Sequence, residues 1–154
     1  MHIPTEADWG DYEGDLDQKS AHKVFAGRTN QEMLVRFGEN VIERTAELRW
    51  MPAVPFRYYM IGFRDYVMAR KFKYDDGSDA ASCFLNLIAD KFEARPELVL
   101  PIMHELLPAL RYVAENQALF NADESIYGSF RNMLARIDAG AAAARECPQA
   151  LPKT

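Results

Sequence analysis

Residues 79–94 read DAASCFLNLIADKFEA, and this stretch decides the fold class. Its apolar side chains recur at helical spacing and cover more than half of the helical circumference. An apolar surface this wide requires contacts on two sides, so we expect the segment at the centre of a helical bundle, with an interface to another chain as the alternative. The side chains concerned are Ala80, Ala81, Cys83, Phe84, Leu85, Leu87, Ile88 and Phe92.

The sequence before this stretch predicts two further main helices. Thr29-Asn-Gln-Glu32 has the capping-box pattern, and the apolar spacing after it predicts a helix over residues 30–51. The sequence Pro52-Ala-Val-Pro55 ends that helix and suits the first turn of a second one, over residues 55–72. The apolar face of this second helix is unusually aromatic. The apolar face of the first helix, over residues 30–51, consists of Leu34, Phe37, Val41, Thr45 and Leu48.

The sequence after residue 94 is helical in pattern as well. An apolar face continues from Val99 to Val113 across two prolines, which predicts a kinked helix or two short helices in line. Asn121-Ala-Asp-Glu124 is an N-cap arrangement, and an amphipathic stripe follows it. No segment has the pattern of a strand. We therefore predict an all-α bundle of about five main helices in one domain, residues 20–146, with a short α-solenoid as the less favoured alternative.

The formal net charge of −5 comes from an N-terminal arm, residues 1–19. Six carboxylates lie before the first basic residue, Lys19, which leaves 18 basic and 17 acidic side chains in the rest of the chain. A body without a basic excess does not predict nucleic-acid binding. The arm has no helical period, so we predict an irregular or extended segment that packs on its own domain or docks on another chain. Its candidate interaction residues are Trp9, Asp11, Tyr12, Glu13, Asp15 and Asp17.

The remaining features exclude several classes of protein. The chain has no apolar stretch near the roughly 20 residues that cross a bilayer and no leader pattern at its start, so we expect a cytoplasmic protein without a membrane partner. Two cysteines and three scattered histidines support neither a disulfide framework nor a metal site, and we predict no cofactor. Residues 147–154 are predicted to form a loose C-terminal tail.

The sequence also lacks the common catalytic signatures, which favours a protein that is not an enzyme. It contains no glycine-rich phosphate loop, no Gly-x-Ser-x-Gly and no His-Glu-x-x-His. The best ligand-site candidate is the helix over residues 55–72, because phenol hydroxyls and fixed cations can orient an anionic ligand. Core packing with cations along the rim is the alternative. The candidate residues are Arg57, Tyr58, Tyr59, Arg64 and Tyr66.

Three functional hypotheses follow from these patterns. The first is a non-enzymatic interaction protein that self-associates, most simply as a homodimer, because an acidic arm and a basic second helix are separated along the chain. The second is a helical small-molecule-binding protein or an enzyme that uses the pocket rich in Arg and Tyr. The third is an inhibitory or immunity-type protein that presents its acidic arm to a basic target, with binding that salt weakens.

Overall fold

The computed structural model describes residues 1–147. All secondary-structure elements in this range are helices, which confirms the all-α prediction. The chain divides into two compact units, residues 1–76 and the residues from 77 onward. The single domain expected over residues 20–146 stays a prediction. No helix among the described residues is both long and apolar enough to cross a membrane.

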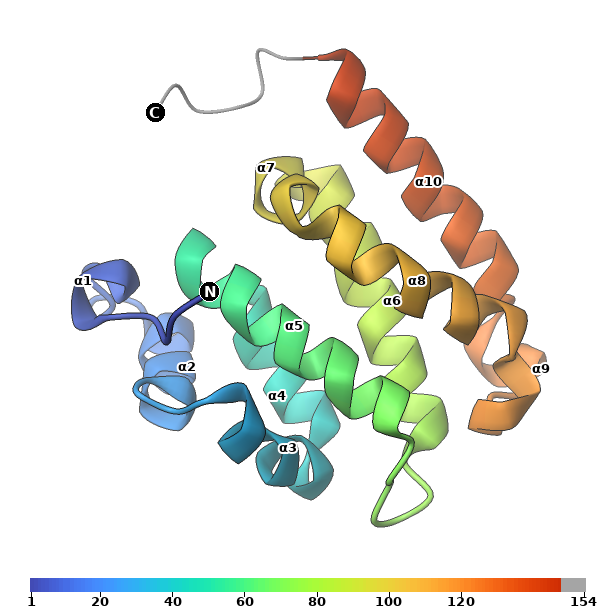
Figure 1. Cartoon of the computed structure of the whole chain (residues 1–154), viewed down its shortest axis with the longest axis horizontal. Coiled ribbons are helices and arrows are strands. Elements are labelled where there is room, and N and C mark those ends of the chain that lie inside the picture. The colour runs from blue at the N-terminus through green and yellow to red at the C-terminus, as the bar shows by residue number, and fades with distance from the viewer. Residues whose placement is uncertain (148–154) are drawn as a thin grey trace. The chain divides into compact units, whose positions relative to one another are not determined.

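The N-terminal unit contains α1 (Glu6–Trp9), α2 (Leu16–Phe25), α3 (Asn30–Glu39), α4 (Val41–Arg49) and α5 (Ala53–Ala69) (Figure 1). Helix α5 packs against α1, α3 and α4, and α2 packs against α4. Aromatic rings fill the space between these helices. The Phe37 and Phe63 rings stack with centroids 5.0 Å apart, and Phe25 meets Tyr59 edge-on at 4.9 Å. The aromatic face predicted for the second helix is therefore the core of this unit.

The helix predicted over residues 30–51 is in fact two helices. Asn40 has an extended backbone (φ −162°, ψ 90°), which ends α3. Its side-chain oxygen accepts a hydrogen bond from the backbone N–H of Glu43 at 3.0 Å and so caps α4. An asparagine side chain offers the backbone an alternative to the helical hydrogen bond, which explains the break inside a continuous apolar pattern.

The N-terminal arm is more ordered than the irregular segment that we predicted. Thr5 and Asp8 form a capping box that starts α1, and Asp15 caps α2 through the backbone N–H groups of Asp17 and Gln18. Helix α1 has only four residues, too few for a visible apolar period, and α2 begins at a side-chain cap rather than at an apolar repeat.

Trp9 joins this arm to the rest of the N-terminal unit. Its side chain is only 1% exposed, its ring meets His22 edge-on at 5.3 Å, and it lies 6.4 Å from the Tyr59 ring. Tyr12 stacks on His22 at 3.7 Å. Of the two arrangements predicted for the arm, the structure has the one in which it packs on its own domain.

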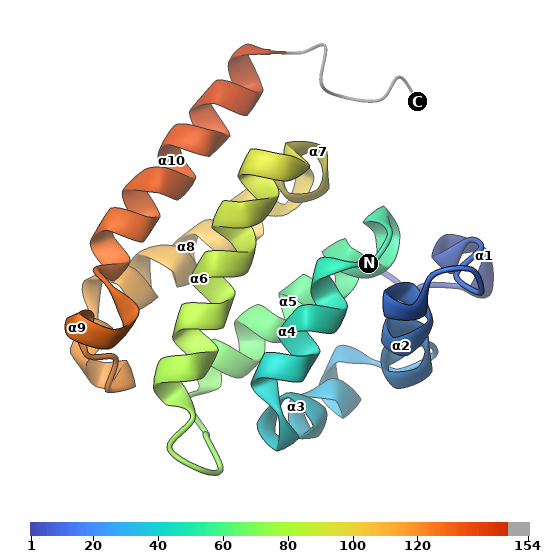
Figure 2. The same cartoon turned by 180° about the vertical axis from the view of Figure 1, so that it is seen from behind.

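The unit from residue 77 onward contains α6 (Gly77–Ala94), α7 (Pro96–Val99), η1 (Leu100–Ile102), α8 (Met103–Glu115), η2 (Gln117–Phe120), α9 (Glu124–Tyr127) and α10 (Phe130–Glu146) (Figure 2). Helix α6 packs against α10, α7 and η2. Its central position, which the sequence predicts, is thus found within this unit. Helix α10 comes close at Gly140, where a Cβ atom would lie 2.8 Å from the Cβ of Phe92.

The helices after α6 agree with the prediction except that the last predicted helix is divided in two. The predicted kinked helix is α7, η1 and α8 in succession, with Pro101 in η1 and Pro108 inside α8. The last predicted helix is interrupted, because α9 ends at Gly128 (φ 73°) and Ser129 caps a new helix, α10. Ile126, which lies in α9 before this interruption, is 75% exposed. Residues 148–154 of the predicted tail lie outside the described residues.

Candidate functional site

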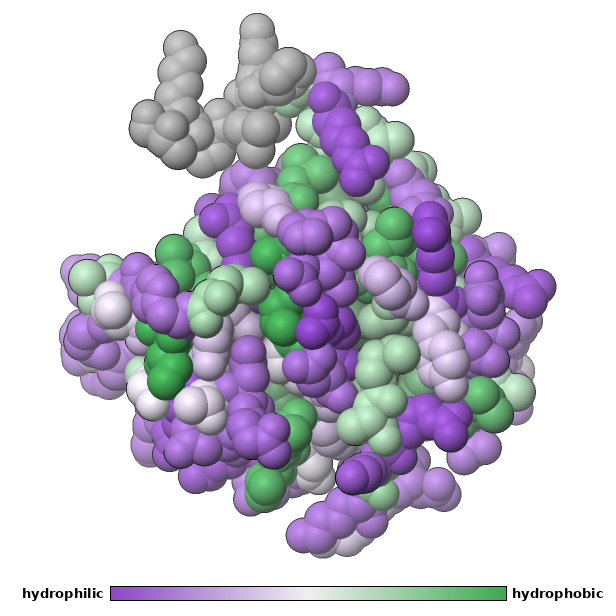
Figure 3. Space-filling model, viewed as in Figure 1, coloured by the Kyte–Doolittle hydropathy of each residue, from purple (hydrophilic) through white to green (hydrophobic). Residues whose placement is uncertain are grey.

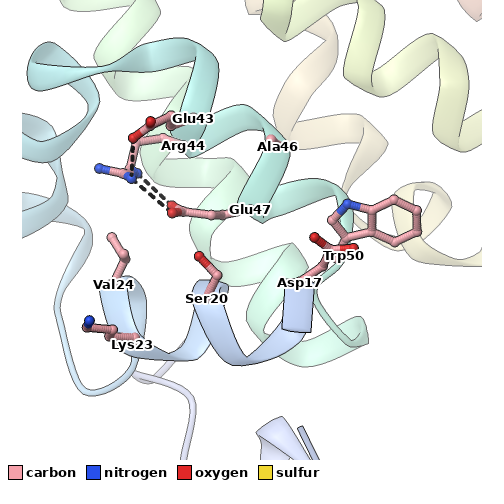
Figure 4. A pocket seen from close by; sticks show the side chains of 9 residues that line it. All are labelled: Asp17, Ser20, Lys23, Val24, Glu43, Arg44, Ala46, Glu47 and Trp50. Carbon is pink, nitrogen blue, oxygen red and sulfur yellow. Dashed lines mark hydrogen bonds and ion pairs between the residues drawn. The ribbon is translucent and has the colours of Figure 1, made fainter. Parts of the chain in front are cut away.

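A cleft of about 450 Å³ lies between α2 and α4 in the N-terminal unit (Figure 4). We call it the α2–α4 cleft. Its lining is mostly polar and carries more carboxylates than cations. The residues that line it are Asp17, Ser20, Lys23, Val24, Glu43, Arg44, Ala46, Glu47 and Trp50.

An ion pair between Arg44 and Glu47 forms the wall of the cleft on α4. The Arg44 Nε atom lies 2.6 Å from Glu47 Oε2, and Nη2 lies 2.9 Å from Oε1, so the guanidinium binds the carboxylate through two nitrogens. Both side chains are only 10% exposed. The pair forms because residues three apart share a helix face, and Glu43 adds a further contact to Arg44 at 3.3 Å.

The electrostatic setting of Glu47 differs from that of a surface carboxylate. Burial raises the pKa of the Glu47 carboxyl, and the hydrogen bonds from Arg44 only partly oppose this effect. A hydrogen bond with Ser20, across the cleft on α2, also acts to lower this pKa. Arg44 and Glu47 therefore hold each other in place. The other charged side chains of the lining are Asp17, Lys23 and Glu43, and Glu43 also contacts Arg44.

Trp50 lies at the C-terminal end of α4, next to the cleft, and is 49% exposed. Figure 4 shows its indole at the end of the cleft that also holds Asp17. An aromatic face beside carboxylates suits a cationic group, because both the ring and the negative charge attract it. Tryptophan is also one of the residue types that contribute most to binding energy at protein interfaces.

A second hollow, the α3–α5 groove, has a volume of about 280 Å³ and an apolar floor. Tyr66 lines it; burial and the negative charge of Asp76 raise the pKa of its hydroxyl. That buried hydroxyl has no hydrogen-bond partner among the described residues. The lining residues are Leu34, Val35, Gly38, Glu39, Tyr66, Ala69, Lys71 and Lys73.

The predicted Arg/Tyr site on α5 is divided between different surroundings. Tyr59 is fully buried and donates to the backbone oxygens of Phe25 at 2.6 Å and Arg28 at 2.8 Å, so its hydroxyl is already used inside the unit. Burial raises the pKa of this hydroxyl, in keeping with a structural role. For Tyr59 the structure has the core-packing alternative.

Tyr58 and Arg64, two other members of this predicted site, have partners in the N-terminal unit. The Tyr58 hydroxyl accepts from the backbone N–H of Asn30 at 3.3 Å, and Arg64 forms an ion pair with Asp65 at 2.8 Å. Arg57 is half-buried and Tyr66 belongs to the α3–α5 groove. A role for Arg57 and Arg64 in binding an anion stays a prediction.

The predicted interaction residues of the arm separate into buried and exposed ones. Trp9 lies in the core, whereas the four carboxylates are exposed. Asp15 caps α2, and Glu13 pairs with Lys19 at 3.2 Å. Asp17 contributes to the α2–α4 cleft. Of the residues predicted for the arm, these carboxylates are therefore ones that a second protein can reach.

Sequence reasoning missed Trp50 and the Arg44–Glu47 pair. The available signal for Trp50 was its absence from the apolar face predicted over residues 30–51, which ends at Leu48. The pair had no such signal, because its burial depends on how α2 covers α4. Among residues 1–147, no group of three His, Cys, Asp or Glu side chains is placed to hold a metal ion.

Neither a protein-family model, nor a curated protein sequence, nor a solved structure matches this chain.

Proposed function

We propose that this chain is a non-enzymatic protein-interaction module that self-associates through its N-terminal unit. The observation that carries the proposal is the distribution of exposed apolar side chains. Of the eleven exposed large apolar residues within the described part of the chain, nine belong to residues 1–76. They are Met1, Ile3, Leu16, Val35, Ile42, Trp50, Val54, Met68 and Tyr74.

The surface of this unit supports binding to another protein. Figure 3 shows green hydrophobic side chains among the purple polar ones over the N-terminal helices, on the left of the view, and further green side chains elsewhere on the same face. Single exposed apolar residues are common on monomers, but their concentration on one unit, together with a half-exposed tryptophan, is typical of a protein interface.

Sedimentation equilibrium of the untagged full-length chain tests this proposal. We expect the average mass to rise from 17.6 kDa toward an integer multiple as the concentration increases through the micromolar range. A mass of 17.6 kDa at every concentration would contradict self-association.

A second candidate function, binding of a basic protein, rests on the lining of the α2–α4 cleft. Asp17, Glu43 and Trp50 offer negative charge and an aromatic face to a Lys or Arg side chain. An arginine-rich peptide should change Trp50 fluorescence, and the change should weaken with salt. Glu43→Gln should reduce the affinity, whereas Glu97→Gln, outside this cleft, should leave it unchanged. Equal affinity for both variants would remove this candidate.

A further inference from the structure

Leu16 has an apolar side chain that is exposed to solvent although it belongs to a helix. It is the first residue of α2 and is 85% exposed, more than any other large apolar residue described. Asp15 and Asp17 flank it, and Asp15 caps the helix. The segment therefore presents one leucine between two carboxylates on a fixed helix start.

The α3–α5 groove is complementary to this segment in polarity and charge. Its lining is mostly apolar, and its charged residues are Lys71, Lys73 and Glu39. Glu39 pairs with Arg36 at 3.8 Å, so the cations exceed the carboxylate by one. Within the described residues neither lysine forms an ion pair, and Lys73 contacts the ring of Tyr74. Tyr66, which also lines the groove, has a buried hydroxyl without a hydrogen-bond partner among the described residues.

We propose that the Leu16 segment of one copy binds in the α3–α5 groove of a second copy. The proposal rests on the self-association proposed above and names the surfaces that carry it. Leu16 would enter the apolar floor, while its flanking carboxylates approach Lys71 and Lys73. The groove volume of about 280 Å³ is ample, since a cavity of about 150 Å³ already accepts benzene.

The geometry within one chain points to a second copy as the occupant. Leu16 is exposed and the groove in the same unit is open, so the two do not meet inside one molecule. Each copy carries one segment and one groove. When the Leu16 segment of each copy binds the groove of the other, both segments and both grooves are occupied, and the result is a closed dimer with twofold symmetry.

The first experiment removes the apolar anchor. Leu16→Asp should lower the association constant at least about tenfold in sedimentation equilibrium, because burying the new carboxylate opposes docking. Ile126→Asp is the matched control: Ile126 is another exposed apolar residue at a helix of the other unit, and its replacement should change the constant less than twofold. Circular dichroism of both variants checks that the helices persist.

The second experiment reverses the charges. Asp17→Lys alone, and Lys71→Glu with Lys73→Glu, should each weaken association, because like charges then face each other. Combined in one chain, the reversals restore opposite charges at residue 17, although not at Asp15, and the association constant should recover at least threefold over either partial variant. Asp15 is left unchanged because it caps α2.

Three results would overturn the inference in distinguishable ways. A wild-type chain that stays monomeric would remove the proposed self-association and this contact with it. A wild-type dimer that Leu16→Asp leaves intact would remove only this contact and leave the proposed function standing. Added mass from an anionic amphiphile bound to the monomer in native mass spectrometry, lost in the Lys71→Glu, Lys73→Glu variant, would assign the groove to a small ligand instead.

Discussion

At the scale of single residues, the two tryptophans have opposite roles. Trp9 is 1% exposed and fixes the N-terminal arm to the core, whereas Trp50 is 49% exposed beside the α2–α4 cleft. The arm is acidic and short of apolar residues, and Trp9 is its one buried aromatic side chain. This explains why an acidic segment without a helical period is nevertheless ordered.

Replacing each tryptophan by alanine should therefore have different effects on folding. We expect Trp9→Ala to lower the free energy of unfolding by about 3–5 kcal/mol, the usual cost of removing a large buried aromatic side chain. Trp50→Ala, the control, should change it by no more than about 0.5 kcal/mol. Urea unfolding followed by circular dichroism at low protein concentration measures both, and equal losses would contradict the positions described here.

The attachment of the arm should also depend on pH. Glu6 accepts hydrogen bonds from Tyr12 at 2.9 Å and contacts His22 Nε2 at 2.8 Å, and these contacts lower the pKa of its carboxyl. A carboxyl whose pKa is lowered on folding stabilises the folded state above its unfolded value, near 4.5, and this contribution is lost as the pH falls through the folded value.

Trp9 fluorescence in a Trp50→Phe variant reports this change. We expect the emission to shift to longer wavelength as the pH falls below about 4.5, because Trp9 becomes exposed when the arm loosens. Adding Glu6→Gln should flatten this part of the titration. An identical acid titration with and without Glu6 would show that another group controls the arm.

At the scale of helices, short polar signals decide where each element begins and ends. Asn40 divides α3 from α4, although the apolar spacing is continuous across it. Asn40→Ala should lower the free energy of unfolding by about 1 kcal/mol, because the backbone N–H of Glu43 loses its cap. Asn132→Ala, at an exposed site in α10, is the control and should have little effect. No loss in Asn40→Ala, with a rise in helical circular dichroism, would indicate one continuous helix.

The contact between α6 and α10 depends on a small residue. A Cβ atom at Gly140 would lie 2.8 Å from the Cβ of Phe92, so Gly140→Ala should cost about 1–3 kcal/mol through overpacking. Gly14→Ala is the matched control, because nothing lies within 4 Å of a Cβ atom there. Chemical denaturation measures the free energy of unfolding of both variants. A Gly140→Ala variant as stable as the wild type would contradict this close contact.

The comparison of sequence with structure shows which of these signals can be read in advance. Apolar periodicity predicted the helical class, the central α6 and the proline-kinked α7–α8 segment, because each depends on local spacing. It missed the division at Asn40, since a single hydrogen-bonding side chain leaves the spacing unchanged. It also missed the α2–α4 cleft, because the burial of Arg44 and Glu47 requires two helices that are distant in the sequence.

At the scale of the whole molecule, the exposed large apolar residues of the described chain are concentrated in residues 1–76. The unit from residue 77 onward contributes a well-packed helical core around α6, with Leu119 and Ile126 as its exposed large apolar residues in the described range. This division of surface properties is the basis for assigning protein binding to the N-terminal unit.

Hydrogen exchange measured by mass spectrometry, on dilute and concentrated samples of the untagged chain, tests the central claim most directly. Association through the N-terminal unit predicts slower exchange at high concentration in residues 1–76, greatest at the start of α2 and around the α3–α5 groove, with the described residues from 77 onward unchanged. Equal exchange at both concentrations, or slowing confined to residues 77–147, would contradict it.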